Sequence, residues 1–79
     1  MTYSHITVES DGPLASLTFN RPQVLNAFNN ETMDECRLAL HSFAADDAIR
    51  AVLVRGEGRA FSAGFDMKAA AERQVSNAA

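Results

Sequence analysis

The segment from Ala51 to Lys68 constrains the fold more than any other part of the chain. It begins with the apolar run Ala51–Val54, which forms most of an expected strand from Ile49 to Val54. Three successive apolar residues inside a strand predict burial on both faces, as in a parallel sheet. The glycine of Ala63-Gly64-Phe65-Asp66 then separates this strand from a helix that we expect to begin at Asp66. Backbone N–H groups at such a junction can point into open space and hold an anion.

Two short segments rich in β-branched and apolar residues precede this region. Ile6–Val8 and Leu14–Phe19 are predicted to be strands, and the second alternates along its length. Asp11–Pro13 supplies a turn between them, which predicts an antiparallel hairpin. Pro22 then ends the second strand and leads the chain into a loop.

The segment from about Glu31 to Ala44 is predicted to be a helix. Asn29 or Asn30 can cap its N-terminus, and acidic residues suit the positive end of the helix dipole. The predicted buried face contains Met33, Cys36, Leu40, Phe43 and Ala44. The opposite face is expected to carry Asp34, Arg37, His41 and Ser42. The element order is therefore β-β-α-β-α, an α/β arrangement in one small domain.

Composition excludes several classes of protein. The 47% share of hydrophobic residues is typical of a globular chain rather than a disordered one. The net charge is −3 and the seven Lys and Arg residues are scattered, so no nucleic-acid partner is expected. No apolar stretch approaches the ~20 residues that span a bilayer, and the N-terminus lacks the regions of a signal peptide. A lone cysteine, Cys36, cannot form an internal disulfide, which favours a cytoplasmic location.

Three other kinds of site fit the sequence poorly. Gly56-Glu57-Gly58 lacks the third glycine of a dinucleotide fingerprint, and no Gly-Lys-Ser/Thr phosphate loop is present. A nucleophile elbow at Ser62 would need a later histidine, whereas His5 and His41 both precede Ser62. Ser62 is therefore interpreted as a structural hydroxyl. Two distant histidines and one cysteine provide no metal-ligand spacing, so no metal site is expected.

Two motifs carry a resemblance to a known family. They are Asn20-Arg21-Pro22-Gln23-Val24-Leu25-Asn26-Ala27-Phe28 and Arg59-Ala60-Phe61-Ser62-Ala63-Gly64-Phe65-Asp66-Met67-Lys68. Together they resemble the crotonase (enoyl-CoA hydratase/isomerase) family, over nearly all of the chain from Ile6 to about Lys68. The resemblance implies that residues 1–79 form a partial domain, the front β-β-α-β-α portion of the crotonase ββα spiral. The remainder of that domain would lie outside this chain.

The resemblance also implies site residues. The backbone N–H of Phe65 would be the first donor of a thioester oxyanion hole, and the second donor would lie beyond this chain. Amide donors stabilise the negative charge that an enolate-like state places on the thioester oxygen. Substrate-binding positions implied by the resemblance are Gln23, Val24, Leu25, Arg59, Ala63, Gly64 and Lys68.

Individual contacts with coenzyme A follow from the same resemblance. The Ala63 carbonyl would accept from the adenine amino group, and the loop 23–25 would lie along the pantetheine and phosphates. Arg59 and Lys68 would lie near the phosphates, whereas Gln23 lacks the lysine charge that many relatives carry there. Asn20 and Arg21 are expected to hold the shape of the loop.

The implied function is that of an enzyme of acyl-CoA and fatty acid metabolism, with a coenzyme A thioester as substrate and no cofactor. Hydration, isomerisation, thioester hydrolysis and dehalogenation all stay open, because the acids that move the proton would lie beyond this chain. A homo-oligomer, or association with the missing remainder of the enzyme, is expected. The alternative is a non-catalytic fragment or split-chain module that associates with another polypeptide. A small serine hydrolase built around Ser62 ranks third.

Overall fold

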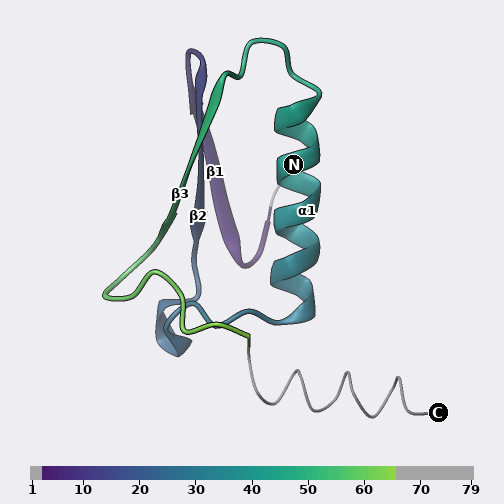
Figure 1. Cartoon of the computed structure of the whole chain (residues 1–79). Coiled ribbons are helices and arrows are strands. Elements are labelled where there is room, and N and C mark those ends of the chain that lie inside the picture. The colour runs from purple at the N-terminus through teal and green to yellow at the C-terminus, as the bar shows by residue number, and fades with distance from the viewer. Residues whose placement is uncertain (1–2, 66–79) are drawn as a thin grey trace, which may run out of the picture.

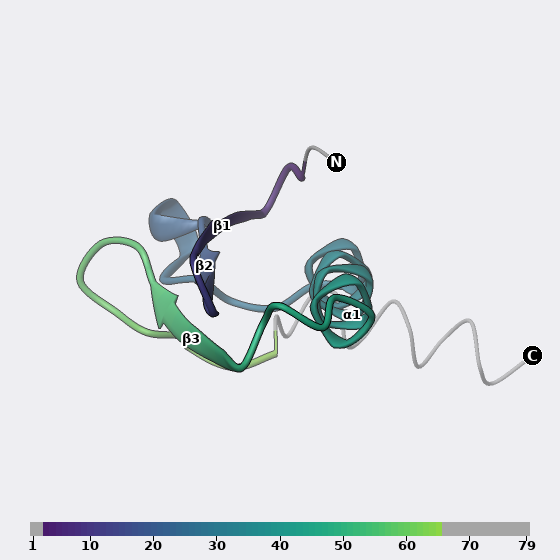
Figure 2. The same ribbon diagram turned by 90° about the horizontal axis from the view of Figure 1, so that it is seen from above.

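The computed structural model describes residues 3–65. Its elements are β1 (Ile6–Asp11), β2 (Leu14–Phe19), the short 3-10 helix η1 (Pro22–Val24), α1 (Asn30–Ala44) and β3 (Ala51–Gly56). Figure 1 shows α1 running beside the sheet, and Figure 2 shows the helix and the strands as separate layers. This mixed α/β arrangement confirms the predicted fold class, and the helix predicted from Asp66 lies outside the described residues.

The sheet has the strand order β1-β2-β3. β1 and β2 form the predicted antiparallel hairpin, whose turn contains Gly12 at a φ of 60°. β2 and β3 are parallel, and their register pairs Leu14 with Ala51 and Phe19 with Gly56. The carboxyl ends of β2 and β3 therefore meet at one edge of the sheet, and the loops that follow them emerge together.

Several element boundaries differ from the predicted ones, since β1 continues to Asp11 beyond the predicted end at Val8, and β3 ends at Gly56 rather than Val54. β3 begins at Ala51 rather than Ile49, because the N–H of Ile49 closes a turn on the Asp46 carbonyl at 3.0 Å. The helix cap is Asn29, one of the two predicted candidates; its Oδ1 accepts from the backbone N–H of Thr32 at 2.8 Å and from the Thr32 hydroxyl at 2.7 Å. Satisfying these otherwise unpaired groups stabilises the first turn of α1.

The predicted buried face of α1 is partly wrong. Met33 and Leu40 are 41% and 45% exposed, and Ala44 is also exposed. The helix instead buries Thr32 and Ala39, and Ala39 packs in the core with Ile6, Leu17 and Phe19 of β1 and β2. Cys36 and Phe43 pack half-buried against this core. The small side chain of Ala39 lets the helix approach the sheet closely. Asp34, Arg37, His41 and Ser42 are exposed, as predicted.

The prediction that β3 is buried on both faces is also wrong. Val52, Leu53 and Val54 are all exposed, with Leu53 at 46%. In the described part of the chain β3 is an edge strand beside β2, and α1 packs mainly on β1 and β2. Burial of both faces of a parallel strand needs a covering layer on each side. The apolar side chains of β3 are therefore suited to pack against further structure that residues 3–65 do not provide.

Gly56 closes β3 where the backbone passes very close to itself. A Cβ at this position would lie 2.3 Å from the Phe61 carbonyl oxygen and 2.6 Å from that of Ala60. We expect Gly56→Ala to cost about 1–3 kcal/mol of unfolding free energy, because backbone atoms must move to make room. Urea unfolding measures this loss. Gly12→Asn is the matched control, since Asn tolerates the positive φ and a Cβ there meets nothing within 4 Å. Equal stability of the Gly56 variant and the parent would contradict the close approach.

Candidate active site

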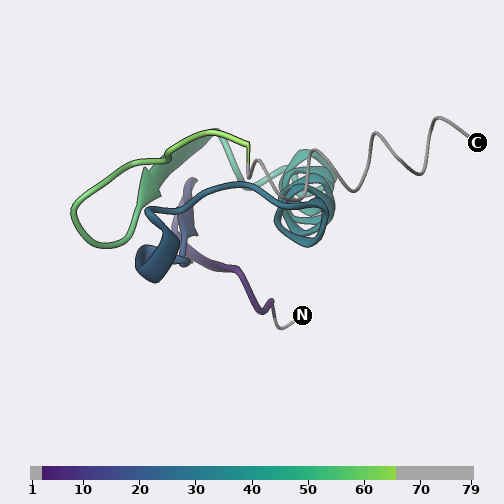
Figure 3. The ribbon, with the colours of Figure 1, turned by 90° about the horizontal axis from the view of Figure 1, so that it is seen from below.

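Two loops lie together at the carboxyl edge of the sheet. The first follows β2 and contains η1, and the second follows β3 and ends at Phe65 (Figure 3). The N–H of Glu57 donates to the Phe19 carbonyl at 2.8 Å, which holds the start of the second loop against the end of β2. Open α/β sheets bind ligands at the carboxyl ends of their strands, so this edge is the candidate site.

An aromatic cluster supports both loops. The Phe19 ring packs edge-on against Phe28 at a centroid distance of 4.8 Å and against Phe61 at 5.2 Å. Phe28 belongs to the first loop and Phe61 to the second. Edge-to-face pairs of this kind add about 0.5–1.5 kcal/mol beyond simple burial. The cluster therefore fixes the two loops on the same strand end.

The peptide unit between Gly64 and Phe65 has a defined orientation. The Phe28 N–H donates to the Gly64 carbonyl at 2.8 Å, within a parallel bridge that pairs Phe28 with Phe65. In a trans peptide the C=O and the following N–H point in opposite directions. The Phe65 N–H therefore points away from the Phe28 segment, and among residues 3–65 no acceptor binds it.

The residues before Phe65 are held at the backbone. The Ala63 N–H donates to the Leu25 carbonyl at 2.9 Å. Gly64 has a φ of 93°, a backbone conformation that residues with a side chain rarely adopt. A Cβ at this position would meet no atom within 4 Å. The positive φ, and not a lack of room for a side chain, therefore explains why glycine occupies this position.

Ser62 has a structural role, as expected. Its hydroxyl donates to the Asn26 carbonyl at 3.0 Å, and its Oγ accepts from the Gly64 N–H at 3.0 Å. Because that N–H points at Ser62, the Ala63 carbonyl of the same peptide points away from it. The donor hydrogen of Ser62 and one of its two acceptor lone pairs are engaged by backbone groups, which argues against a nucleophile.

The first loop turns sharply after η1. Leu25 and Asn26 both have positive φ values, 55° and 57°. Arg21 holds this turn: its backbone N–H donates to Asn26 Oδ1 at 2.8 Å, and its guanidinium donates to the Ala27 carbonyl. The loop-shaping role predicted for Arg21 is confirmed, whereas Asn20 contributes through its backbone N–H, which donates to the His5 carbonyl at 2.8 Å.

The structure gathers most of the predicted site residues at this edge. Gln23, Val24 and Leu25 are exposed on the first loop, beside the segment that carries Ala63, Gly64 and Phe65. Arg59 is exposed in the turn that follows β3. Lys68 lies outside the described residues. Sequence reasoning missed the extent to which Asn26 joins the two loops, although an asparagine tolerates positive φ and offers both donors and an acceptor.

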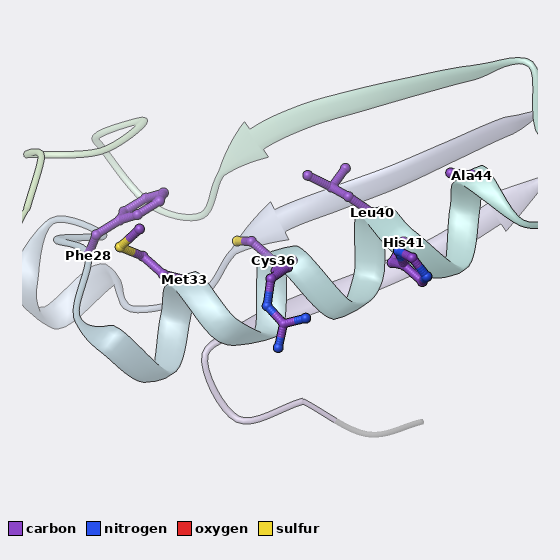
Figure 4. Close-up of a pocket in the computed structure, with 7 residues that line it drawn as sticks. Phe28, Met33, Cys36, Leu40, His41 and Ala44 are labelled. Atoms are coloured by element: carbon purple, nitrogen blue, oxygen red, sulfur yellow. The ribbon is translucent and has the colours of Figure 1, made fainter.

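A separate apolar groove runs along α1. Its volume is about 560 Å³, and Figure 4 shows Phe28 and Met33 at one end and Ala44 at the other. Cys36 lines this groove, and burial, with a smaller effect of Glu35, raises the pKa of its thiol. A raised pKa keeps the thiol protonated at neutral pH, so Cys36 acts as a packing group rather than a nucleophile.

No group of three or more His, Cys, Asp or Glu side chains within residues 3–65 is placed to hold a metal ion. Among the helices of the described chain, none has the length and apolar character to cross a membrane.

Comparison with known proteins decides the family. The model of the enoyl-CoA hydratase/isomerase family matches residues 9–79. The chain belongs to this family. The resemblance carried by the two motifs is thereby confirmed, and the crotonase relationship covers both loops of the candidate site.

Individual relatives agree with this assignment. A probable enoyl-CoA hydratase of Rhizobium meliloti is 44% identical over 68 residues, which cover 86% of this chain and 26% of the relative. The crystal structure of an enoyl-CoA hydratase/isomerase from Xanthobacter autotrophicus Py2 superposes with a TM-score of 0.85 at 44% identity, covering 92% of this chain and 27% of that one. A 4-chlorobenzoyl coenzyme A dehalogenase of Arthrobacter is 39% identical over 64 residues, or 81% of this chain and 23% of the relative.

The chain thus spans only about a quarter of the length of these relatives. Their names include a probable enoyl-CoA hydratase and a 4-chlorobenzoyl coenzyme A dehalogenase. Similarity over this segment is therefore compatible with more than one reaction.

Proposed function

We propose that this chain forms the front part of an acyl-CoA site in an enoyl-CoA hydratase/isomerase-like enzyme, with the Phe65 N–H as one donor of the oxyanion hole. The observation that carries this proposal is the orientation of the Gly64–Phe65 peptide. Its carbonyl is anchored by Phe28, so its N–H points away from that segment. An anchored, outward-pointing amide is suited to stabilise charge on a thioester oxygen without reorganising.

The remaining substrate contacts extend the same proposal. The Ala63 carbonyl, which points away from Ser62, accepts from the adenine amino group. Exposed Val24 and Leu25 offer an apolar surface to the pantetheine arm, and Gln23 provides a neutral amide. Arg59 and Lys68 supply positive charge for the phosphates. No cofactor takes part, because the thioester itself carries the group that stabilises the carbanion.

Further polypeptide completes the enzyme in this proposal. It supplies the second oxyanion donor and the acidic side chains that move the proton. The exposed edge and apolar faces of β3 support such an association, since unpaired strand edges bind other strands. The relatives are about four times as long as the matched segment, which gives ample chain for this covering layer. Assembly into a homo-oligomer belongs to the same completed enzyme.

Activity therefore depends on completion of the site. We expect the isolated 79-residue chain to show no hydration of crotonyl-CoA, because the proposed site takes its second oxyanion donor and its acids from further polypeptide. The test compares it with a chimera in which residues 1–79 replace the matching segment of the Rhizobium meliloti relative. Hydration is measured in both samples as a loss of absorbance of the conjugated thioester.

The chimera is expected to turn over acyl-CoA. Hydration by the isolated chain above a Phe65→Pro control would contradict the need for completion. A folded chimera that neither binds nor converts acyl-CoA would overturn the proposed function.

A further inference from the structure

Asn26 is a buried polar joint between the two loops. Asn26 is only 1% exposed to solvent. Oδ1 accepts from the Arg21 N–H at 2.8 Å, and Nδ2 donates to the carbonyls of Glu57 and Ala60, both at 2.8 Å. Both amide protons and one oxygen lone pair are therefore used. A buried amide stabilises a structure only where such partners are present, so the two loops are built around this group.

The backbone of Asn26 continues the connection towards Phe65. Its φ of 57° brings its N–H to the Arg21 carbonyl at 2.8 Å and leaves its own carbonyl facing Ser62. The Ser62 hydroxyl donates to that carbonyl and accepts from the Gly64 N–H, each at 3.0 Å. Asn26 is thus connected through one hydroxyl to the peptide unit next to the one that carries the Phe65 N–H.

We infer that Asn26, acting through Ser62, is a positioning residue that sets the direction of the Phe65 N–H. The inference rests on the proposed oxyanion role of that amide. Three hydrogen bonds hold the 57–65 segment to Asn26, at Glu57, Ala60 and Ser62. An oxyanion donor acts only at about 2.7–3.1 Å from the charged oxygen. A shift of about 1 Å at such a donor can cost ~10²-fold in rate.

The chimera provides the test. Asn26→Asp keeps the acceptor for Arg21 but turns the two donor bonds into contacts between oxygens, and Ser62→Ala removes the hydroxyl. We expect each variant to lower kcat by about ten- to a hundredfold with little change in KM, since binding surfaces are retained. Ser62→Thr keeps a hydroxyl and is expected to restore most of the rate. Val8→Ala is the matched control, because it weakens the core beneath the sheet without touching either loop.

Infrared spectroscopy of a bound acyl-CoA gives a second readout. A hydrogen bond to the thioester oxygen lowers the C=O stretching frequency, so the parent chimera is expected to show a red shift. Asn26→Asp and Ser62→Ala are expected to show a smaller shift, and the Val8→Ala control the full one. A parent with no red shift would refute the oxyanion proposal itself. A parent with the shift, and variants that keep both the shift and kcat, would refute the role of Asn26 alone.

Amide hydrogen exchange distinguishes loosening of the two loops from a general loss of stability in a variant. In the chimera, Ser62→Ala is expected to speed exchange of the Phe28 and Ala63 amides about tenfold relative to the β2 amide of Leu17. Selective loosening of the two loops supports the inference. Equal changes at all three amides would show general destabilisation and would overturn it.

Discussion

Replacing the Phe65 amide by an ester is expected to lower the kcat of the chimera by ~10²–10³, the usual loss for one oxyanion donor. The ester, built with the hydroxy-acid analogue of phenylalanine, removes the N–H with little change in shape. Phe65→Leu keeps the N–H and is expected to retain most of the activity. Steady-state kinetics with crotonyl-CoA measure both variants. Phe65→Pro is a poorer choice, because it also restricts the backbone of the loop.

One matched control separates two effects of this ester. An ester at residue 65 makes the Gly64 carbonyl a weaker acceptor, and that carbonyl binds the Phe28 N–H at 2.8 Å. An ester at residue 28 removes the donor of the same bond and leaves the Phe65 N–H intact. The residue 28 ester also weakens the Ala27 carbonyl, which accepts from the Arg21 guanidinium, so it is the more disruptive of the two changes. A larger loss of kcat in the residue 65 ester than in the residue 28 ester is therefore attributable to the Phe65 N–H. Parent-like turnover by the residue 65 ester would show that the assignment is wrong.

Truncation of Leu17 is expected to have the largest effect on stability. Leu17 is 1% exposed in the central strand β2, within the core formed by Ile6, Leu17, Phe19 and Ala39. Leu17→Ala should cost about 2–5 kcal/mol, because it removes buried methyl groups and leaves a cavity. Chains of this size have total stabilities of only about 5–10 kcal/mol. Denaturant unfolding of the 79-residue chain and of the chimera measures the loss.

Leu40→Ala is the comparison for Leu17→Ala. Leu40 is 45% exposed and lines the open groove, so its truncation in the isolated chain should cost less than about 1 kcal/mol. In the chimera, a larger cost would show that added polypeptide packs on the groove. If both leucines cost the same in the isolated chain, the helix orientation seen here would be wrong. An unchanged small cost in the chimera would show that the groove stays open.

Local signals account for the parts of the fold that sequence reasoning predicted correctly. Asp11–Pro13 is a strong turn signal between alternating segments, so the hairpin was predictable. The cap at Asn29 and the apolar spacing of α1 likewise depend on neighbours along the chain. The match of Arg59–Lys68 to a family motif correctly indicated the family. The same match predicted that the Phe65 N–H is a donor of the oxyanion hole.

Long-range contacts account for what sequence reasoning missed. Apolar periodicity gave α1 a broad buried face, but Ala39, rather than Leu40, lies against the sheet. The choice between adjacent helical stripes depends on how closely the helix can approach β1 and β2. Similarly, Asn26 is one of several polar loop residues in the sequence, and only its partners at Glu57 and Ala60 distinguish it.

The sequence by itself determined β1, β2, α1 and β3, their order along the chain, and the family. The elements depend on turn residues, caps and apolar spacing, and the family on two short motifs, all of which are read from a few neighbouring residues. Only the tertiary structure decided that the loops after β2 and β3 meet, that Asn26 joins them, and that the Gly64 carbonyl is turned to Phe28. These features follow from the parallel pairing of strands more than 30 residues apart, for which no local pattern specifies the register.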